Sequence, residues 1–236
     1  MPYYRIANET VAKRLGGLHS AKIVLVSVDF DEVERPMREG DWDAVGEKLA
    51  QAARSLERAG ADILVLCTNT MHKVAGAIEA AVGIPLLHIV DAAAAEIARR
   101  GIAKVGLLGT RFTMEQDFYR ARLRERHGIE VLIPPEAERD IVHRVIFDEL
   151  CRGKLLEDSR AAHRRIIEGL VASGAQGIVL GCTELSMLVG QADATVPVFD
   201  TTAIHARAAA EWALGSGVLA AMDGAALEGP ATAAMG

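Results

Sequence analysis

The chain has 236 residues, of which 50% are hydrophobic, and it carries a net charge of -6 with a pI near 5.7. This composition supplies a core for one large or two small domains. The acidic balance disfavours nucleic acid and anionic membranes as partners. No stretch approaches the roughly 18 consecutive apolar residues of a membrane span, and the start lacks the pattern of a secretory signal. We therefore expect a cytoplasmic protein.

Apolar runs alternate with segments of helical periodicity along the chain. Buried strands are expected at residues 22–30, 62–67, 84–90, 104–110, 130–134, 176–182 and 196–200. Helices are expected at residues 3–15, 42–59, 70–83, 91–101, around Phe118, and at 138–151, 156–172 and 202–214, with a loop at 31–41. This alternation predicts an α/β fold with mainly parallel sheets flanked by helices.

The three cysteines differ in their surroundings. An odd count without an export signal indicates free thiols, and the scattered histidines give no metal-binding spacing, so we expect no metal. Cys151 lies in an apolar helical stretch and is expected in the core. Cys67 and Cys182 each follow a short apolar run, GADILVL and GAQGIVLG, and each is followed by threonine. Because ligands bind outside the carboxyl ends of parallel strands, both thiols are expected at a site.

The second half of the chain repeats the order of elements in the first. We expect a first domain formed by residues 1–91 plus 200–215, a second domain formed by residues 92–199, and a disordered tail at 216–236. The strand at 104–110 precedes a helix that contains the letters FYR, whereas the helix at 3–15, with the letters YYR, has no such strand before it. The first domain is therefore expected to lack its N-terminal strand and a glycine turn.

Two thiols across a cleft suit the inversion of an amino acid at Cα. One thiolate removes the proton and the opposite thiol returns one to the other face of the planar intermediate. The positive end of a following helix is expected to favour each thiolate. Polar groups beside the cysteines are expected to hold the substrate; they belong to Thr68, Asn69, Thr70, Thr183 and Glu184. Glu184 is also a candidate to assist Cys182 or to position the substrate ammonium.

An acidic substrate in an acidic protein needs local positive charge. Arg35 and Arg38 follow the strand expected at 22–30, so they are candidates to bind a distal carboxylate. Arg111, after the turn at 109–110, and Lys154 are further candidates.

Four segments closely resemble motifs of the aspartate/glutamate racemase family: CTNTMHKV, GCTELSMLV, LLGTRFTMEQDFYR and PVFDTTAIHA. Within that family, the resemblance is to the L-aspartate/glutamate-specific and broad-specificity amino-acid racemases, and it covers about residues 2–213. It implies a cofactor-independent isomerase, usually dimeric, with two pseudo-symmetric three-layer domains and the active site in the cleft between them.

The resemblance also assigns roles to residues. It makes Cys67 and Cys182 the two acid/base groups and places the polar residues that follow them in contact with the substrate. Glu184 stands where the cell-wall glutamate racemases commonly have histidine, which favours the aspartate-type branch. Relatives begin with a strand and a Gly-Gly-Met-Ser turn, which this sequence lacks.

Two alternatives to racemisation remain open. The first is a maleate-isomerase-like or decarboxylase-like enzyme of the same superfamily, which uses a single cysteine. The second is a truncated, inactive protein that only binds an amino acid, because its first strand is missing.

Overall fold

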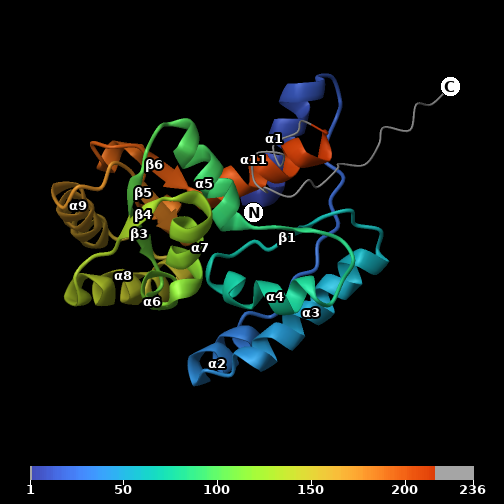
Figure 1. Cartoon of the computed structure of the whole chain (residues 1–236), viewed down its shortest axis with the longest axis horizontal. Coiled ribbons are helices and arrows are strands. Elements are labelled where there is room, and N and C mark those ends of the chain that lie inside the picture. The colour runs from blue at the N-terminus through green and yellow to red at the C-terminus, as the bar shows by residue number, and fades with distance from the viewer. Residues whose placement is uncertain (1, 216–236) are drawn as a thin grey trace.

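The computed structural model describes residues 2–215 and has two parallel sheets (Figure 1). The smaller sheet pairs β1 (Leu64–Val65) with β2 (Leu86–Leu87). The larger has the order β4-β3-β5-β6, formed by Glu130–Leu132, Lys104–Gly109, Ile178–Gly181 and Val198–Asp200. All four pairings are parallel. The expected α/β fold is therefore confirmed, while the expected tail at 216–236 lies outside the described residues.

Helices cover both sheets and join them. Those before β3 are α1 (Pro2–Leu15), α2 (Asp31–Glu39), α3 (Trp42–Arg58), η1 (Thr70–Val74), α4 (Ala75–Glu79) and α5 (Ile89–Arg99). The later ones are α6 (Arg111–Glu115), α7 (Asp117–His127), α8 (Glu136–Asp148), η2 (Leu150–Arg152), α9 (Glu157–Ala172), α10 (Leu185–Leu188), η3 (Gln191–Asp193) and α11 (Thr201–Ala213). The long helices begin and end within a few residues of their predicted bounds.

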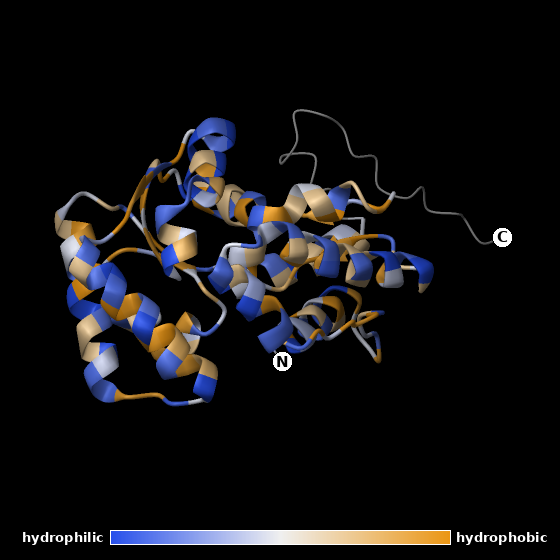
Figure 2. Ribbon diagram, turned by 90° about the horizontal axis from the view of Figure 1, so that it is seen from below, coloured by the Kyte–Doolittle hydropathy of each residue, from blue (hydrophilic) through white to orange (hydrophobic). Residues whose placement is uncertain are grey.

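Two separate hydrophobic cores define two lobes. The second lobe is built around the larger sheet, where Leu107, Leu108 and Val179 on β3 and β5 are fully buried. The first lobe is built around β1, where Leu64 packs with Val45 of α3 and other buried residues of α2, α3 and η1. Helices of both lobes carry hydrophobic and hydrophilic residues, as helices that cover a core do (Figure 2). The assignment of α11 to the first domain stays a prediction.

Strands β3 and β5 come very close together at their carboxyl ends. A Cβ on Gly109 would lie 2.9 Å from the carbonyl oxygen of Gly181, so only glycine fits there without a shift of the backbone. This close approach brings the residues that follow the two strands, Thr110 and Cys182, to the same edge of the sheet.

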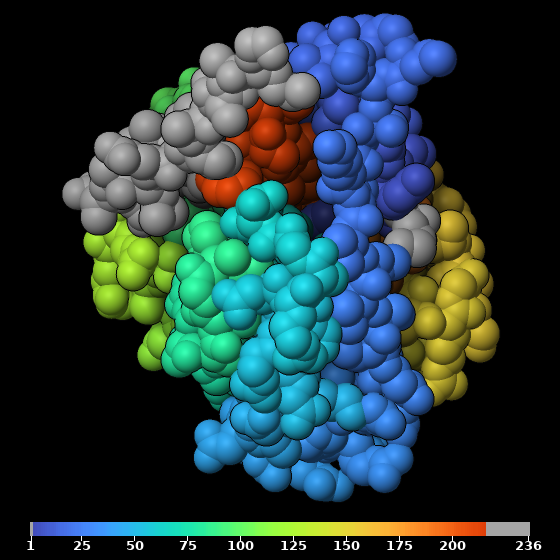
Figure 3. Space-filling view, turned by 90° about the vertical axis from the view of Figure 1, so that its right-hand side faces the viewer, coloured from blue at the N-terminus to red at the C-terminus, as the bar shows by residue number. Residues whose placement is uncertain are grey.

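The strand predicted at residues 22–30 is wrong. The segment has no sheet pairing and lies exposed, with Leu25 58% and Phe30 52% accessible. Figure 3 shows this part of the chain in blue on the surface of the molecule. Its apolar composition correctly indicates strand propensity, but a strand also needs a neighbour to accept its backbone hydrogen bonds.

The loop predicted at 31–41 is also wrong, because most of it forms α2. Val33 and Met37 lie four residues apart, so they share one face of the helix and are buried in the first-lobe core. Acidic residues in the first turn favour the helix start, and Gly40, with φ of 83°, ends it in the left-handed conformation. These factors outweigh the backbone hydrogen bond lost at Pro36.

A buried carboxylate ties α5 to α7 in the second lobe. Asp91 accepts hydrogen bonds from Arg122 Nε at 2.7 Å and from His127 Nε2 at 2.8 Å. Burial alone would raise the pKa of Asp91, but the hydrogen bonds from Arg122 and His127 outweigh it and hold the pKa well below its usual range.

We expect Asp91→Asn to lower the free energy of unfolding by about 3 kcal/mol at pH 7, because it removes the buried charge that pairs with the half-buried Arg122. The lowered pKa means that the wild-type advantage is complete above the unfolded-state pKa of about 4 and shrinks as the pH falls below it. Chemical denaturation at pH 7 and pH 3 measures both effects. Asp117→Asn, at an exposed ion pair, is the matched control. Equal stability of Asp91→Asn and wild type at pH 7 would contradict this account.

Candidate active site

Cys67 and Cys182 lie at the carboxyl ends of strands in the two lobes. Cys182 directly follows β5 and is buried, with 8% of its surface accessible. Cys67 follows β1 by two residues and is exposed. The matched positions agree with the internal repeat, but the two thiols differ in environment.

A pair of buried hydrogen bonds links the two cysteine-bearing loops. Asn69 Nδ2 donates to Thr201 Oγ1 at 3.0 Å, and Thr201 Oγ1 donates to the Leu180 carbonyl at 2.7 Å. Because the threonine hydrogen is used on Leu180, the asparagine must present its NH2 group, which fixes the orientation of the amide. Asn69 is two residues after Cys67, and Leu180 is two residues before Cys182. The link therefore sets the position of one loop relative to the other.

A triangle of threonine hydroxyls makes a second link between the lobes. Thr70 Oγ1 lies 3.0 Å from Thr110 Oγ1 and 3.1 Å from Thr113 Oγ1, and the latter two lie 3.2 Å apart. All three residues are buried. Thr110 also caps α6, because its hydroxyl accepts from the backbone N–H of Thr113. The first turn of η1 is thus held against the end of β3.

Three buried histidines support the loop that follows Cys67. His72 binds the Thr68 carbonyl through Nδ1 at 2.7 Å and accepts from the Ile89 N–H through Nε2 at 3.1 Å, which fixes its tautomer. The His72 ring packs against His88 and His205, with ring centroids 4.4 and 6.0 Å away. Burial lowers the pKa of all three, to about 3 for His88 and about 4 for His205. The cluster is therefore neutral at physiological pH.

Tyr3 connects this cluster to the first cysteine. Its hydroxyl lies 2.9 Å from Nδ1 of His205, whose Nε2 lies 2.8 Å from the Leu87 carbonyl. Burial, and then the negative charge of Cys67 when ionised, raise the pKa of Tyr3 well above its usual value. Sequence reasoning missed these groups, since single histidines spread along the chain give no spacing signal.

Both candidate catalytic groups are thiols at rest. Burial raises the pKa of Cys67 to about 11, although one side of the residue is open to solvent. Its Sγ has only a long contact, 3.5 Å, to the Val65 carbonyl. Burial and the charge of Glu184 raise the pKa of Cys182 well above its usual value.

Glu184 is the direct partner of Cys182. Its Oε2 accepts from Cys182 Sγ at 3.0 Å and from Thr183 Oγ1 at 2.6 Å.

The expectation that helix ends lower both thiol pKa values is wrong. η1 begins three residues after Cys67, and α10 is only four residues long, so burial and the Glu184 charge dominate.

Several predicted binding side chains are occupied by protein contacts. Asn69 and Thr70 link the lobes, and the Thr183 hydroxyl binds Glu184. Their predicted contacts with substrate remain predictions, together with that of Thr68.

The candidate arginines pair with carboxylates outside the cysteine motifs. Arg35 and Arg38 are exposed on α2 and pair with Asp31 and Glu34 of the same helix, and Arg111 pairs with Asp140. Within residues 2–215, neither these arginines nor Lys154 forms an ion pair with either cysteine motif. Their roles in binding a distal carboxylate stay predictions.

The prediction that Cys151 lies in the core is wrong. It lies exposed in η2, and burial of part of its side chain, followed by the charge of Glu184, raises its pKa to about 11. Helix α8 ends at Asp148, so the apolar pattern that predicted burial stops before this cysteine.

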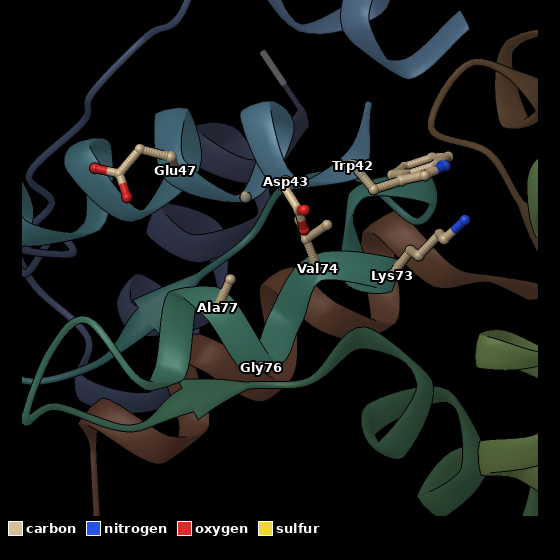
Figure 4. Close-up of a pocket in the computed structure, with 8 residues that line it drawn as sticks. Trp42, Asp43, Glu47, Lys73, Val74, Gly76 and Ala77 are labelled. Carbon is tan, nitrogen blue, oxygen red and sulfur yellow. The ribbon is translucent and has the colours of Figure 1, made fainter. Parts of the chain in front are cut away.

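A hollow of about 410 Å³ lies between α3 and the η1–α4 segment (Figure 4). Trp42, Lys73 and Val74 are among its lining residues, and Lys73 Nζ lies 3.8 Å from the centre of the Trp42 ring. Neither Cys67 nor Cys182 lines it, so we treat it as separate from the candidate active site.

The described part of the chain holds neither a metal-binding cluster nor a membrane-spanning helix. In residues 2–215, no group of three or more His, Cys, Asp or Glu side chains is arranged to hold a metal ion. No helix in this range has the length and apolarity needed to cross a bilayer.

Comparison with known proteins adds independent findings. The sequence model of the Asp/Glu/Hydantoin racemase family matches residues 1–209. The broad specificity amino-acid racemase RacX of Bacillus subtilis (strain 168) is 26% identical over 174 residues, which are 74% of this chain and 73% of RacX.

Solved structures agree with the family match. A candidate Asp/Glu racemase from Yersinia pestis has 60% identity and a TM-score of 0.85, over 90% of this chain and 93% of that one. An aspartate racemase homologue from Pyrococcus horikoshii OT3 has 35% identity and a TM-score of 0.76, over 90% and 92%. The chain therefore belongs to the Asp/Glu/hydantoin racemase family and is an isomerase of the amino-acid racemase class.

Proposed function

We propose that the chain racemises an amino acid without a cofactor, by moving the Cα proton between Cys67 and Cys182. The observation that carries the proposal is the pair of Cys-Thr loops in matched positions of two lobes, joined by Asn69, Thr201 and the Leu180 carbonyl. A planar intermediate between the two sulfurs would be open to one thiol on each face. Retention of both cysteines disfavours the alternative that uses a single cysteine.

Because the pKa values of Cys67 and Cys182 are raised, the bound substrate must help to form the thiolate that removes the Cα proton. With a pKa of about 11, about one Cys67 thiol in a thousand is ionised at pH 8. The ammonium group of a bound amino acid brings a positive charge that favours the thiolate. For Cys182, Glu184 Oε2 is already the hydrogen-bond acceptor and can take the thiol proton when Cys182 acts as the base. When Cys182 acts as the acid, the negative charge of Glu184 raises the pKa of Cys182 and so keeps its thiol protonated before the transfer.

The proposed substrate is aspartate, glutamate or a broader set of amino acids. The family match and the aspartate racemase homologue support an acidic amino acid, and the similarity to RacX supports broader specificity. The exposed arginines of α2 already pair with carboxylates of their own helix, which favours the broader set. A homodimer and a cytoplasmic location remain part of the proposal.

We expect Cys67→Ser and Cys182→Ser each to reduce racemisation by about a hundredfold or more, because a serine hydroxyl is a far weaker base than a thiolate. Cys151→Ser controls for the loss of a thiol; because Cys151 lies within range of the Glu184 charge but is not one of the two proposed acid/base groups, its loss should reduce the rate far less. The measurement is deuterium incorporation at Cα, with chiral chromatography of aspartate, glutamate and a panel of neutral amino acids. Wild-type exchange into both enantiomers by Cys182→Ser would overturn the two-base proposal.

We expect Glu184→Gln to lower the pKa of Cys182, because it removes the negative charge that opposes the thiolate. Thiolate absorbance against pH measures this in a Cys67→Ser, Cys151→Ser background, where Cys182 is the remaining thiol. In the otherwise wild-type chain, Glu184→Gln should reduce kcat/KM, because a glutamine side chain cannot take the thiol proton of Cys182. The reduction should be equal in both directions, because the equilibrium constant of racemisation is unity. An unchanged titration midpoint would show that Glu184 does not control Cys182.

A further inference from the structure

The hollow between α3 and the η1–α4 segment carries opposite charges on its two sides. Asp43 lies in the first turn of α3, and Lys73 lies in the last turn of η1. In Figure 4, Asp43 points from α3 towards the η1–α4 side, and Lys73 points from η1 towards the Trp42 ring. Glu47, the third charged residue of the lining, is paired with Arg54 at 2.7 Å. Within residues 2–215, neither Asp43 nor Lys73 forms an ion pair, so both charges are available to a ligand.

The surroundings of Lys73 favour an anion as a partner. Its Nζ lies 3.8 Å from the centre of the Trp42 ring, in a cation–π contact. The residue is half-buried, and burial lowers the pKa of Lys73, because an ammonium loses hydration there. An aromatic face replaces that hydration only in part, whereas a carboxylate forms a charge-assisted hydrogen bond with an ammonium. The group that suits this end of the hollow is therefore a carboxylate.

The rest of the lining suits a small body with an apolar part. Val74, Ala77 and Trp42 line the hollow, and Gly76 leaves space on the α4 side, because a Cβ there would meet no atom within 4 Å. The volume of about 410 Å³ is in the lower part of the range that holds small molecules. On the α3 side, Asp43 suits an ammonium group. A carboxylate, an ammonium and an apolar side chain are together the groups of an apolar amino acid.

We propose that this hollow binds one free apolar amino acid, with its carboxylate on Lys73, its ammonium on Asp43 and its side chain beside Trp42. Asp43 and Gly76 are exposed, so the hollow is open to solvent and the ion pairs are screened. The affinity is therefore modest, with a dissociation constant of about 1 mM. Both charged groups of the ligand are needed, because a ligand that lacks one of them loses an ion pair.

The site is separate from the candidate active site but adjoins its support. Neither candidate catalytic cysteine lines the hollow. Lys73 nevertheless belongs to η1, and two other residues of η1, Thr70 and His72, hold the loop that follows Cys67. An amino acid bound to Lys73 therefore contacts the segment that keeps this loop in place.

Trp42 supplies a reporter for the test. The chain has two tryptophans, so Trp212→Phe leaves Trp42 as the only one, and its fluorescence is titrated with L-leucine. Isocaproate and isoamylamine are the matched ligands, since they are leucine without its ammonium and leucine without its carboxylate. In the same background, Lys73→Met removes the charge and keeps a long side chain, and Gly76→Leu fills the hollow. Lys13→Met, on α1, is the control for the loss of a lysine.

We expect leucine to change the Trp42 emission with a dissociation constant of about 1 mM. Both matched ligands should bind about tenfold more weakly or worse, and so should leucine to the Lys73→Met and Gly76→Leu chains. Lys13→Met should leave the affinity unchanged. The proposal is overturned if leucine does not change the emission, if either matched ligand binds as tightly as leucine, or if Lys73→Met binds leucine with unchanged affinity. The readout needs no racemisation, so it is independent of the proposed function.

Discussion

The geometry of the candidate site depends on buried hydrogen bonds between the two lobes. Asn69, Thr201 and the Leu180 carbonyl form one link, and Thr70, Thr110 and Thr113 form the other. Both lie within a few residues of a cysteine, and both are secluded from water. Because a buried polar group is costly when it loses its partner, these links resist sliding of one lobe against the other. The proposed proton transfer between Cys67 and Cys182 would need such fixed positions.

The seclusion that fixes the loops also sets the chemistry of the thiols. Full burial of Cys182 and partial burial of Cys67, which is open to solvent on one side, oppose charge, so both thiols are protonated in the absence of substrate. Such thiols resist adventitious oxidation, which attacks thiolates preferentially. In the proposed mechanism, the reactivity of the thiols depends on charges that arrive with the substrate and, for Cys182, on Glu184. The two thiols are equivalent in the repeat but not in their surroundings.

The sequence predicted most of the helices, the parallel sheets and the cysteine positions, because periodicity and strand-end motifs are local signals. It failed at 22–30 and 31–41, where the outcome depends on partners elsewhere in the fold. Residues 22–30 pair with no strand of the described chain, and Val33 and Met37 in 31–41 pack into the first-lobe core as one face of a helix. The sequence also did not predict the histidine cluster around His72, because the three histidines come from separate segments of the chain. Thiol pKa values depend on burial, which motifs do not report.

The most direct test of the central claim is a crystal structure of the chain with a planar carboxylate analogue of the deprotonated substrate. The account predicts that the analogue lies between the sulfurs of Cys67 and Cys182, with one sulfur facing each side of the atom that represents Cα. A structure in which the two sulfurs open onto separate surfaces, or in which the analogue binds the hollow beside Trp42 instead, would contradict it.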